Sequence, residues 1–139
     1  MDGKNKELTT NFKITGVVSE RQSGRPVKGV LVVAYDKDPL FDDLLGTSET
    51  DTEGRFSIGY AKRNYSKFFG KNPDLYLAVF APPCQMLTDT SSSIRWGATH
   101  HEFFNLKVDE EKLRASRKDA SGDIDLDRDL VDGFEWEVC

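Results

Sequence analysis

The sequence has no long uncharged apolar run. Its longest, Leu75–Cys84, is far shorter than the about 18 residues that a membrane-spanning helix needs. The first residues include lysines, but no apolar stretch follows them, so they do not resemble a cleavable secretory signal. We therefore expect no membrane association and a cytoplasmic location, with export by a leaderless route as the alternative.

Cysteine is equally scarce. The chain has two, Cys84 and Cys139, which are too few for a disulfide-stapled scaffold and form no CxxC motif for zinc or redox chemistry. Because no export signal is visible, we expect two free thiols. The alternative is one bridge between them, which would pin the C-terminal segment to the body of the protein.

The chain also lacks the excess of positive charge that is typical of nucleic-acid binders. Residues 1–118 carry 18 basic and 16 acidic side chains, whereas residues 119–139 carry one basic and eight acidic ones. Since binding to phosphates depends on clustered Lys and Arg, we expect no nucleic-acid partner. With 37% hydrophobic and 31% charged residues, the composition fits one globular domain over residues 11–110, followed by a charged linker and an acidic tail over residues 111–139.

Alternating apolar residues predict short β-strands. Phe12, Ile14 and Val18 share one face of a first strand, and the continuous apolar runs Val30–Tyr35 and Leu75–Phe80 indicate central strands covered on both faces. The expected strands are 12–19, 30–35, 44–50, 56–60, 75–80, 94–96 and 102–108. Strands this short, joined mostly by turns, predict an all-β fold, an antiparallel β-sandwich of about seven strands.

Three connecting segments have their own signals. The turn residues Asp51–Gly54 predict a hairpin between the third and fourth strands. Apolar and charged residues follow helical spacing over Ala61–Phe69, which predicts one short helix. Residues 109–118 are mostly charged and predict a helical turn or linker.

The strands and turns contain four short motifs: Ile14-Thr15-Gly16-Val17-Val18, Gly24-Arg25-Pro26-Val27-Lys28-Gly29-Val30, Leu45-Gly46-Thr47 and Thr50-Asp51-Thr52-Glu53-Gly54-Arg55-Phe56. Together they resemble the transthyretin-like (prealbumin-like) β-sandwich. The fourth motif of this chain is also similar to one found in carboxypeptidase regulatory domains. The resemblance covers about residues 11–110. It implies a small accessory domain beside secreted or multi-component systems, which binds another protein and forms homo-oligomers in some relatives.

Some proteins that resemble this fold are enzymes. Hydroxyisourate hydrolases carry a Tyr-Arg-Gly-Ser motif that this chain does not have. Intradiol dioxygenases hold iron with two Tyr and a His-x-His pair, whereas His100 and His101 are adjacent here and would face opposite sides of a strand. We therefore expect a non-catalytic module, with no catalytic residues and no cofactor.

Acidic residues after the second strand carry the main alternative. Asp36, Asp38, Asp42 and Asp43 supply hard oxygen ligands around one loop, and their pattern is similar to that of calcium-dependent C2 domains. The alternative function is therefore calcium-dependent binding to a membrane or ligand. Local hydrogen bonds that cap turns are the simpler explanation of the same residues.

The acidic tail alternates its charges with large apolar side chains. We expect these side chains to contact a surface of the body or of a partner protein, because they are unusual in a purely solubilising segment. The expected partner-binding residues are Ile124, Leu126, Leu130, Phe134 and Trp136.

Overall fold

The computed structural model describes residues 11–61 and 72–120. Within them the chain forms seven strands, a short 3-10 helix η2 (Ser91–Ser93) and an α-helix α2 (Glu110–Ala120). The strands are β1 (Asn11–Glu20), β2 (Leu31–Asp36), β3 (Asp43–Glu49), β4 (Arg55–Ala61), β5 (Leu75–Ala81), β6 (Gln85–Asp89) and β7 (His101–Val108).

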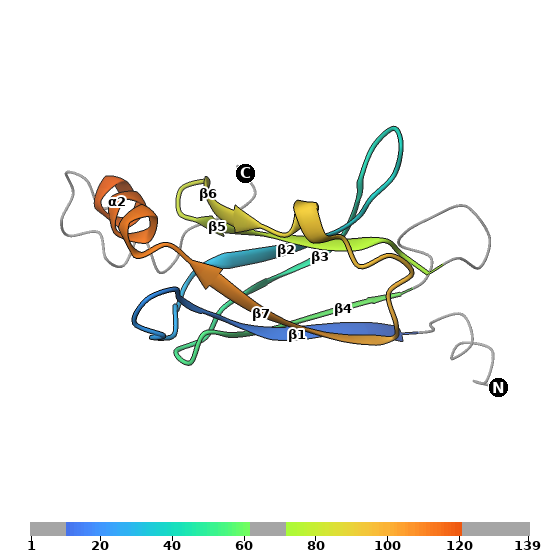
Figure 1. Ribbon diagram of the computed structural model, residues 1–139, viewed down its shortest axis with the longest axis horizontal. Helices are drawn as coiled ribbons and strands as arrows, with labels where there is room; N and C mark the ends of the chain where they lie inside the picture. The colour runs from blue at the N-terminus through green and yellow to red at the C-terminus, as the bar shows by residue number, and fades with distance from the viewer. Residues whose placement is uncertain (1–10, 62–71, 121–139) are drawn as a thin grey trace.

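The strands form two sheets that face each other (Figure 1). One has the order β4-β1-β7 and the other the order β3-β2-β5-β6. This arrangement confirms the predicted all-β sandwich. One pairing differs from the prediction of antiparallel strands. β1 and β7 are parallel, and both run from the loop side of the sandwich toward the opposite end.

The core lies between the sheets and follows the alternation of the sequence. Phe12, Ile14 and Val18 on β1 are buried, as predicted, because every second residue of a strand faces the same side. The apolar runs of β2 and β5 lie next to each other in the centre of the four-stranded sheet, which confirms their predicted central position.

The predicted hairpin between the third and fourth strands is wrong. β3 pairs with β2 in one sheet, whereas β4 pairs with β1 in the other. Thr50 is still bonded to the start of β2 through Val30, but the Gly54 carbonyl already accepts a hydrogen bond from Val18 on β1. The chain therefore changes sheets within the turn, and the positive φ of Gly54 (+74°) allows that path.

Two further predictions need correction. Residues 85–89 form the edge strand β6, where the sequence predicted no strand. The predicted strand over 94–96 is reduced to a single bridge, in which Arg95 and Leu75 exchange two backbone hydrogen bonds of 2.9 Å. Of the predicted helix over Ala61–Phe69, Ala61 ends β4, and the rest lies outside the described residues.

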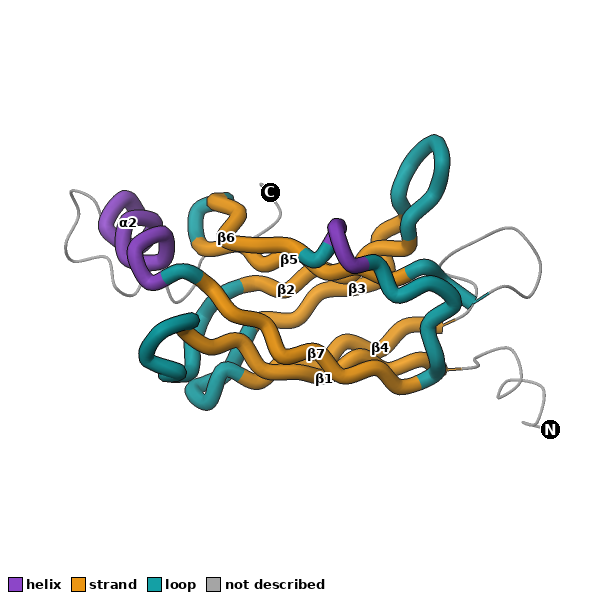
Figure 2. The backbone as a smooth tube through the Cα atoms, in the orientation of Figure 1, coloured by secondary structure: helices purple, strands orange, loops and turns teal. Residues whose placement is uncertain are grey.

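The two ends of the sandwich have different characters (Figure 2). We call residues 37–42, 72–74 and 90–100 the loop end, because they form the loops at the right of the figure. We call residues 21–30, 50–54, 82–84 and 109–120 the turn end, which includes α2 at the left.

Helix α2 packs against the other segments of the turn end. The Asp109 carboxylate caps it by accepting a hydrogen bond from the backbone N–H of Glu111 (2.8 Å). Leu113 is 3% exposed and joins the core. The Glu110 carboxylate accepts hydrogen bonds from the backbone of Gln22 and Ser23. The segment predicted as a helical turn or linker is thus a packed helix.

Cys84 lies at the turn end, between β5 and β6, and it is disulfide-bonded. The expectation of a free thiol at this position is therefore wrong. The free thiol was expected because the first residues indicated a reducing compartment. The sequence held no information about the fold around Cys84. Cys139 lies outside the described residues.

None of the helices within residues 11–61 and 72–120 is long and apolar enough to span a membrane.

Candidate functional site

The loop end is held together around Asp74, the residue before β5. Its carboxylate accepts a hydrogen bond from the backbone N–H of Gly97 (2.9 Å), and its own N–H donates to the Asp36 carboxylate (2.8 Å). The Asp74 carbonyl also accepts from the N–H of Lys37 (2.8 Å). These bonds connect the loop after β2 and the loop before β7 to one anchor point.

Large apolar side chains are exposed mainly at this end. Six are exposed among the described residues: Leu40 (81%), Phe41 (79%), Leu44 (57%), Met86 (43%), Trp96 (66%) and Phe103 (56%). All but Met86 lie in the loop end or in the strand segments next to it. Leu40 and Phe41 lie on the β2–β3 loop, which projects from the sandwich in Figure 1. Such a concentration of exposed apolar groups is typical of an interaction surface.

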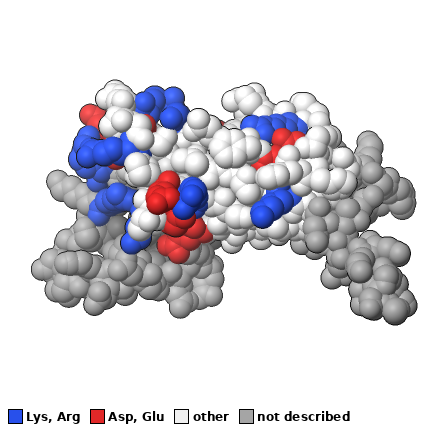
Figure 3. Space-filling view, turned by 90° about the horizontal axis from the view of Figure 1, so that it is seen from below, with Lys and Arg blue, Asp and Glu red and all other residues white. Residues whose placement is uncertain are grey.

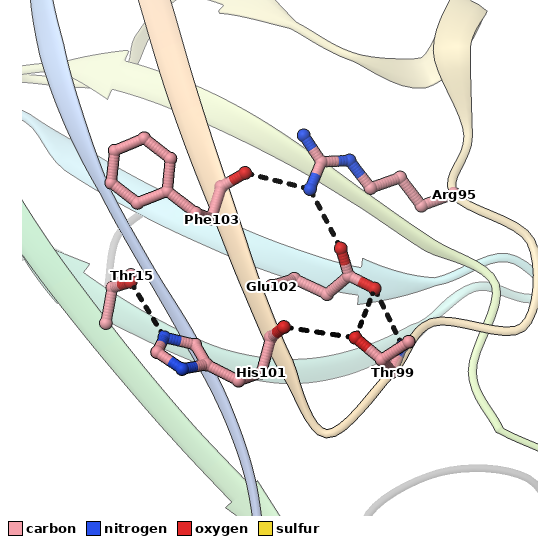
Figure 4. A network of polar contacts seen from close by, with 6 residues as sticks. All are labelled: Thr15, Arg95, Thr99, His101, Glu102 and Phe103. Atoms are coloured by element: carbon pink, nitrogen blue, oxygen red, sulfur yellow. Dashed lines mark hydrogen bonds and ion pairs between the residues drawn. The ribbon is translucent and has the colours of Figure 1, made fainter.

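A network of polar contacts supports the loop that carries Trp96 (Figure 4). The Arg95 guanidinium forms an ion pair with the Glu102 carboxylate (2.9 Å) and donates to the Phe103 carbonyl (2.8 Å). The other oxygen of that carboxylate accepts hydrogen bonds from the backbone (2.7 Å) and hydroxyl (2.9 Å) of Thr99. Arg95 also lies 3.6 Å above the centre of the Phe104 ring, a cation–π contact.

The charge state of Glu102 follows from these contacts. Burial opposes its ionisation, but the hydrogen bonds from Thr99 and Arg95 outweigh burial and hold the pKa of the Glu102 carboxyl below its ordinary value. Glu102 is therefore charged at neutral pH and keeps Arg95 in place. The loop between them is preorganised, which lowers the entropic cost of binding through it.

The two histidines face opposite sides of the sheet. The His100 ring packs on the ring of Phe12, with centroids 4.4 Å apart, whereas His101 Nε2 lies 3.1 Å from the Thr15 hydroxyl oxygen. Phe12 is buried in the core and Thr15 is on the outer face of β1, so the two imidazoles do not converge.

The four aspartates proposed as calcium ligands share one loop, but local groups engage three of them. The Asp36 carboxylate accepts a hydrogen bond from the backbone N–H of Asp74. The Asp38 carboxylate accepts one from the backbone N–H of Leu40 (3.1 Å). Asp42 accepts hydrogen bonds from the Asp38 backbone and from the hydroxyl of Tyr76. Asp43 pairs with Asp36 in the ladder between β2 and β3. Within the described ranges, no group of three or more His, Cys, Asp or Glu is placed to hold a metal ion.

We expect calcium to have little effect on stability, because three of these four carboxylates already have hydrogen-bond donors. Millimolar calcium should change Tm by less than about 1 °C, as measured by differential scanning calorimetry. A rise of several degrees that is lost in the Asp38→Asn/Asp43→Asn double variant would instead establish the calcium alternative.

The contact between Tyr76 and Asp42 predicts a measurable pKa difference. The hydrogen bond from Tyr76 is the main reason why the pKa of the Asp42 carboxyl lies below its ordinary value. The charged form of Asp42 therefore stabilises the fold above the unfolded-state pKa of about 3.9, and this contribution is lost as the pH falls through the lower folded-state pKa.

Replacing Tyr76 by phenylalanine should raise the pKa of Asp42 toward about 3.9, as measured by NMR titration of its carboxyl carbon. Tyr35→Phe is the matched control, because Tyr35 stacks on Tyr76 at 5.1 Å between ring centroids. An unchanged Asp42 pKa in Tyr76→Phe would show that the hydroxyl does not control this carboxylate.

The sequence pointed to other residues than those of the loop end. The predicted binding residues Ile124, Leu126, Leu130, Phe134 and Trp136 lie outside the described residues. Leu40, Phe41 and Trp96 were missed, although one signal was available. Pro39-Leu40-Phe41 is an apolar run inside an acidic loop, where no strand or helix pattern assigns it to the core.

The chain matches no protein-family profile and no curated protein sequence. Its fold is similar to solved structures at low sequence identity. A 9R-lipoxygenase from Cyanothece PCC8801 aligns with a TM-score of 0.49 and 21% identity over 76% of this chain and 19% of the lipoxygenase. The chain therefore spans about a fifth of that enzyme's length.

Two other similar structures match most of their own length. The dioxygenase domain of a dioxygenase carbohydrate-binding protein fusion from Streptomyces sp. SirexAA-E aligns with a TM-score of 0.45 and 16% identity over 71% of this chain and 79% of that domain. An alternative pilotin from the type II secretion system of Vibrio cholerae aligns with a TM-score of 0.45 and 17% identity over 70% of this chain and 96% of the pilotin.

These similarities correct the expectation that the chain is not an enzyme. Several of the similar structures are dioxygenases, and that expectation is therefore withdrawn. The sandwich fold itself is established by the two sheets of this chain.

Proposed function

We propose that the chain is a transthyretin-like β-sandwich that binds another protein through its loop end, as an accessory or assembly module of a multi-component system. The observation that carries this proposal is the concentration of exposed apolar side chains there, with Leu40 and Phe41 each about four-fifths exposed. A soluble partner with an apolar pocket would remove these side chains from water. Burying one such side chain contributes about 1.5–3 kcal/mol.

The charges around the projecting loop indicate the chemistry of the partner. Asp38, Asp42 and Asp43 flank Leu40 and Phe41 in the sequence, and Lys37 is the one basic residue among residues 36–43. The Lys37 ammonium lies 3.8 Å from the Asp42 carboxylate, so Asp42 offsets part of the positive charge of Lys37. The β2–β3 loop therefore has a net negative charge around its exposed apolar side chains. The complementary surface on a partner is an apolar pocket with basic residues at its edge.

Phe41 and Trp96 are the anchors of this proposal. Aromatic side chains dominate binding energies at protein interfaces, since they bury a large area and have few rotatable bonds. Hydrogen bonds accepted by Asp74 and Glu102 fix the loop that carries Trp96, and those accepted by Asp38 and Asp42 brace the loop that carries Phe41, so binding orders little additional backbone.

Site-specific photo-crosslinking tests the proposal. A benzophenone amino acid at position 41 is expected to capture one protein, or a second copy of the chain, in an extract of the cells that make it. Position 52, exposed at the turn end, is the control. The captured protein is then purified and rebound to the unmodified chain. Equal capture from both positions, or a captured protein that does not rebind, would contradict the proposal.

A further inference from the structure

Cys84 is disulfide-bonded, and the chain contains one other cysteine, Cys139. We propose that these two residues are bonded to each other, so that the acidic tail is a closed loop attached to the turn end rather than a free arm. Within a single chain no other sulfur is able to form the bond, because the two methionines have thioethers.

The fold brings the start of the tail to the same end as Cys84. Helix α2 packs beside β6, the strand that begins right after Cys84, since the Lys112 ammonium donates to the Leu87 carbonyl (3.4 Å). Leu113 fixes the helix in the core. Residues 121–139 then have to return only from the end of α2 to the β5–β6 turn. A flexible chain of this length has a root-mean-square reach of about 25 Å.

The charges at the turn end favour this return. A groove of about 570 Å³ opens between β6, β7 and the start of α2, and it is lined by Arg21, Leu87, Thr88, Lys107, Asp109, Glu111 and Lys112. Lys28 adds positive charge on the neighbouring loop, where Arg25 forms an ion pair with Glu20 (3.5 Å). In Figure 3, Lys and Arg side chains gather toward the α2 end of the face shown. Residues 121–139 carry seven acidic side chains and one basic one, so the tail is complementary to the basic side chains of this groove, Arg21, Lys107 and Lys112.

The chemistry of the bond is an ordinary dithiol oxidation. The Cys139 thiolate attacks a small disulfide such as oxidised glutathione and forms a mixed disulfide, releasing one thiol. The Cys84 thiolate then attacks the Cys139 sulfur of that mixed disulfide and releases the second thiol. The two cysteines lose two protons and two electrons, and the small disulfide gains them. Such a bond persists in oxidising compartments, so the proposal favours export of the chain over the cytoplasmic location expected from the sequence.

Peptide mapping of the full chain tests the bond directly. The protein is purified without reductant, and free thiols are blocked with iodoacetamide before digestion. Trypsin should yield peptides 72–95 and 129–139 as one disulfide-linked species, and reduction should separate them. Alkylation of both cysteines in the unreduced protein would overturn the proposal. A disulfide-linked dimer on a non-reducing gel would do the same.

Equilibration with glutathione tests whether the fold directs the bond. The ratio of closed to open chains in glutathione buffers gives the effective concentration of one thiol at the other. We expect this concentration to be at least tenfold higher in buffer than in 6 M guanidinium chloride, since α2 and the charge attraction keep the tail near Cys84. Equal values in the two solvents would show that the folded body does not hold the tail, and would overturn the proposal.

Discussion

Replacing Gly16 by alanine is expected to destabilise the sandwich by more than about 4 kcal/mol, which leaves little or no folded protein at 37 °C. A Cβ atom at this position would lie 2.2 Å from the carbonyl oxygen of Phe104 and 2.6 Å from the Phe56 ring. Gly16 is on β1, the central strand of its sheet, so a backbone shift that relieves the contact with β7 also disturbs the pairing with β4.

Gly59→Ala is the matched control, since Gly59 is also a strand glycine of the same sheet. Its added Cβ would meet its nearest neighbour, the Phe12 carbonyl oxygen, at 3.9 Å, an ordinary contact. We expect the unfolding free energy of this variant, measured by urea denaturation followed by circular dichroism, to stay within about 1 kcal/mol of wild type. Similar losses in both variants would show that loss of glycine itself, and not the contact with Phe104, is responsible.

Replacing Phe41 by serine is expected to weaken binding to the partner captured at position 41 by about 30-fold or more, which is the loss typical of an interface anchor. The side chain is 79% exposed, so its removal should leave Tm within about 1 °C of wild type. Isothermal titration calorimetry measures the affinity.

Met86→Ser is the control for Phe41→Ser, because Met86 is the exposed large apolar residue that lies away from the loop end. Its affinity should stay within a factor of two of wild type. Equal losses in the two variants would mean that general surface hydrophobicity, rather than the loop end, drives binding.

The sequence predicted the strands well where one or both faces are buried. Alternation located β1 and β7, and continuous apolar runs located β2 and β5, since burial constrains every residue of these strands. β6 was missed because Gln85, Met86 and Asp89 are exposed and Leu87 is its one buried residue, which leaves no pattern to recognise.

The pairing of strands was less predictable than their positions. Alternation over β3 and β4 is the same whether the strands share a sheet or face each other across the core. Which sheet each strand joins depends on two backbone hydrogen bonds, one between Thr50 and Val30 and one between Gly54 and Val18. Both form between residues that are far apart in the sequence.

The loop end was not predictable from local pattern because its residues come from three separate segments. Asp74 joins Asp36 to Gly97 only after the strands have assembled. The acidic loop was recognised, but it was interpreted through its carboxylates. The exposed Leu40 and Phe41 between them became apparent only from their exposure in the folded chain.

Hydrogen–deuterium exchange of the complex with the captured partner tests the central claim, that the loop end is the binding surface. Exchange is compared amide by amide between the free and the bound chain. Exchange is expected to slow in residues 38–44 and 94–100 on binding, with no change in the turn at residues 51–54. Slower exchange confined to the turn end, with residues 38–44 unchanged, would contradict that claim.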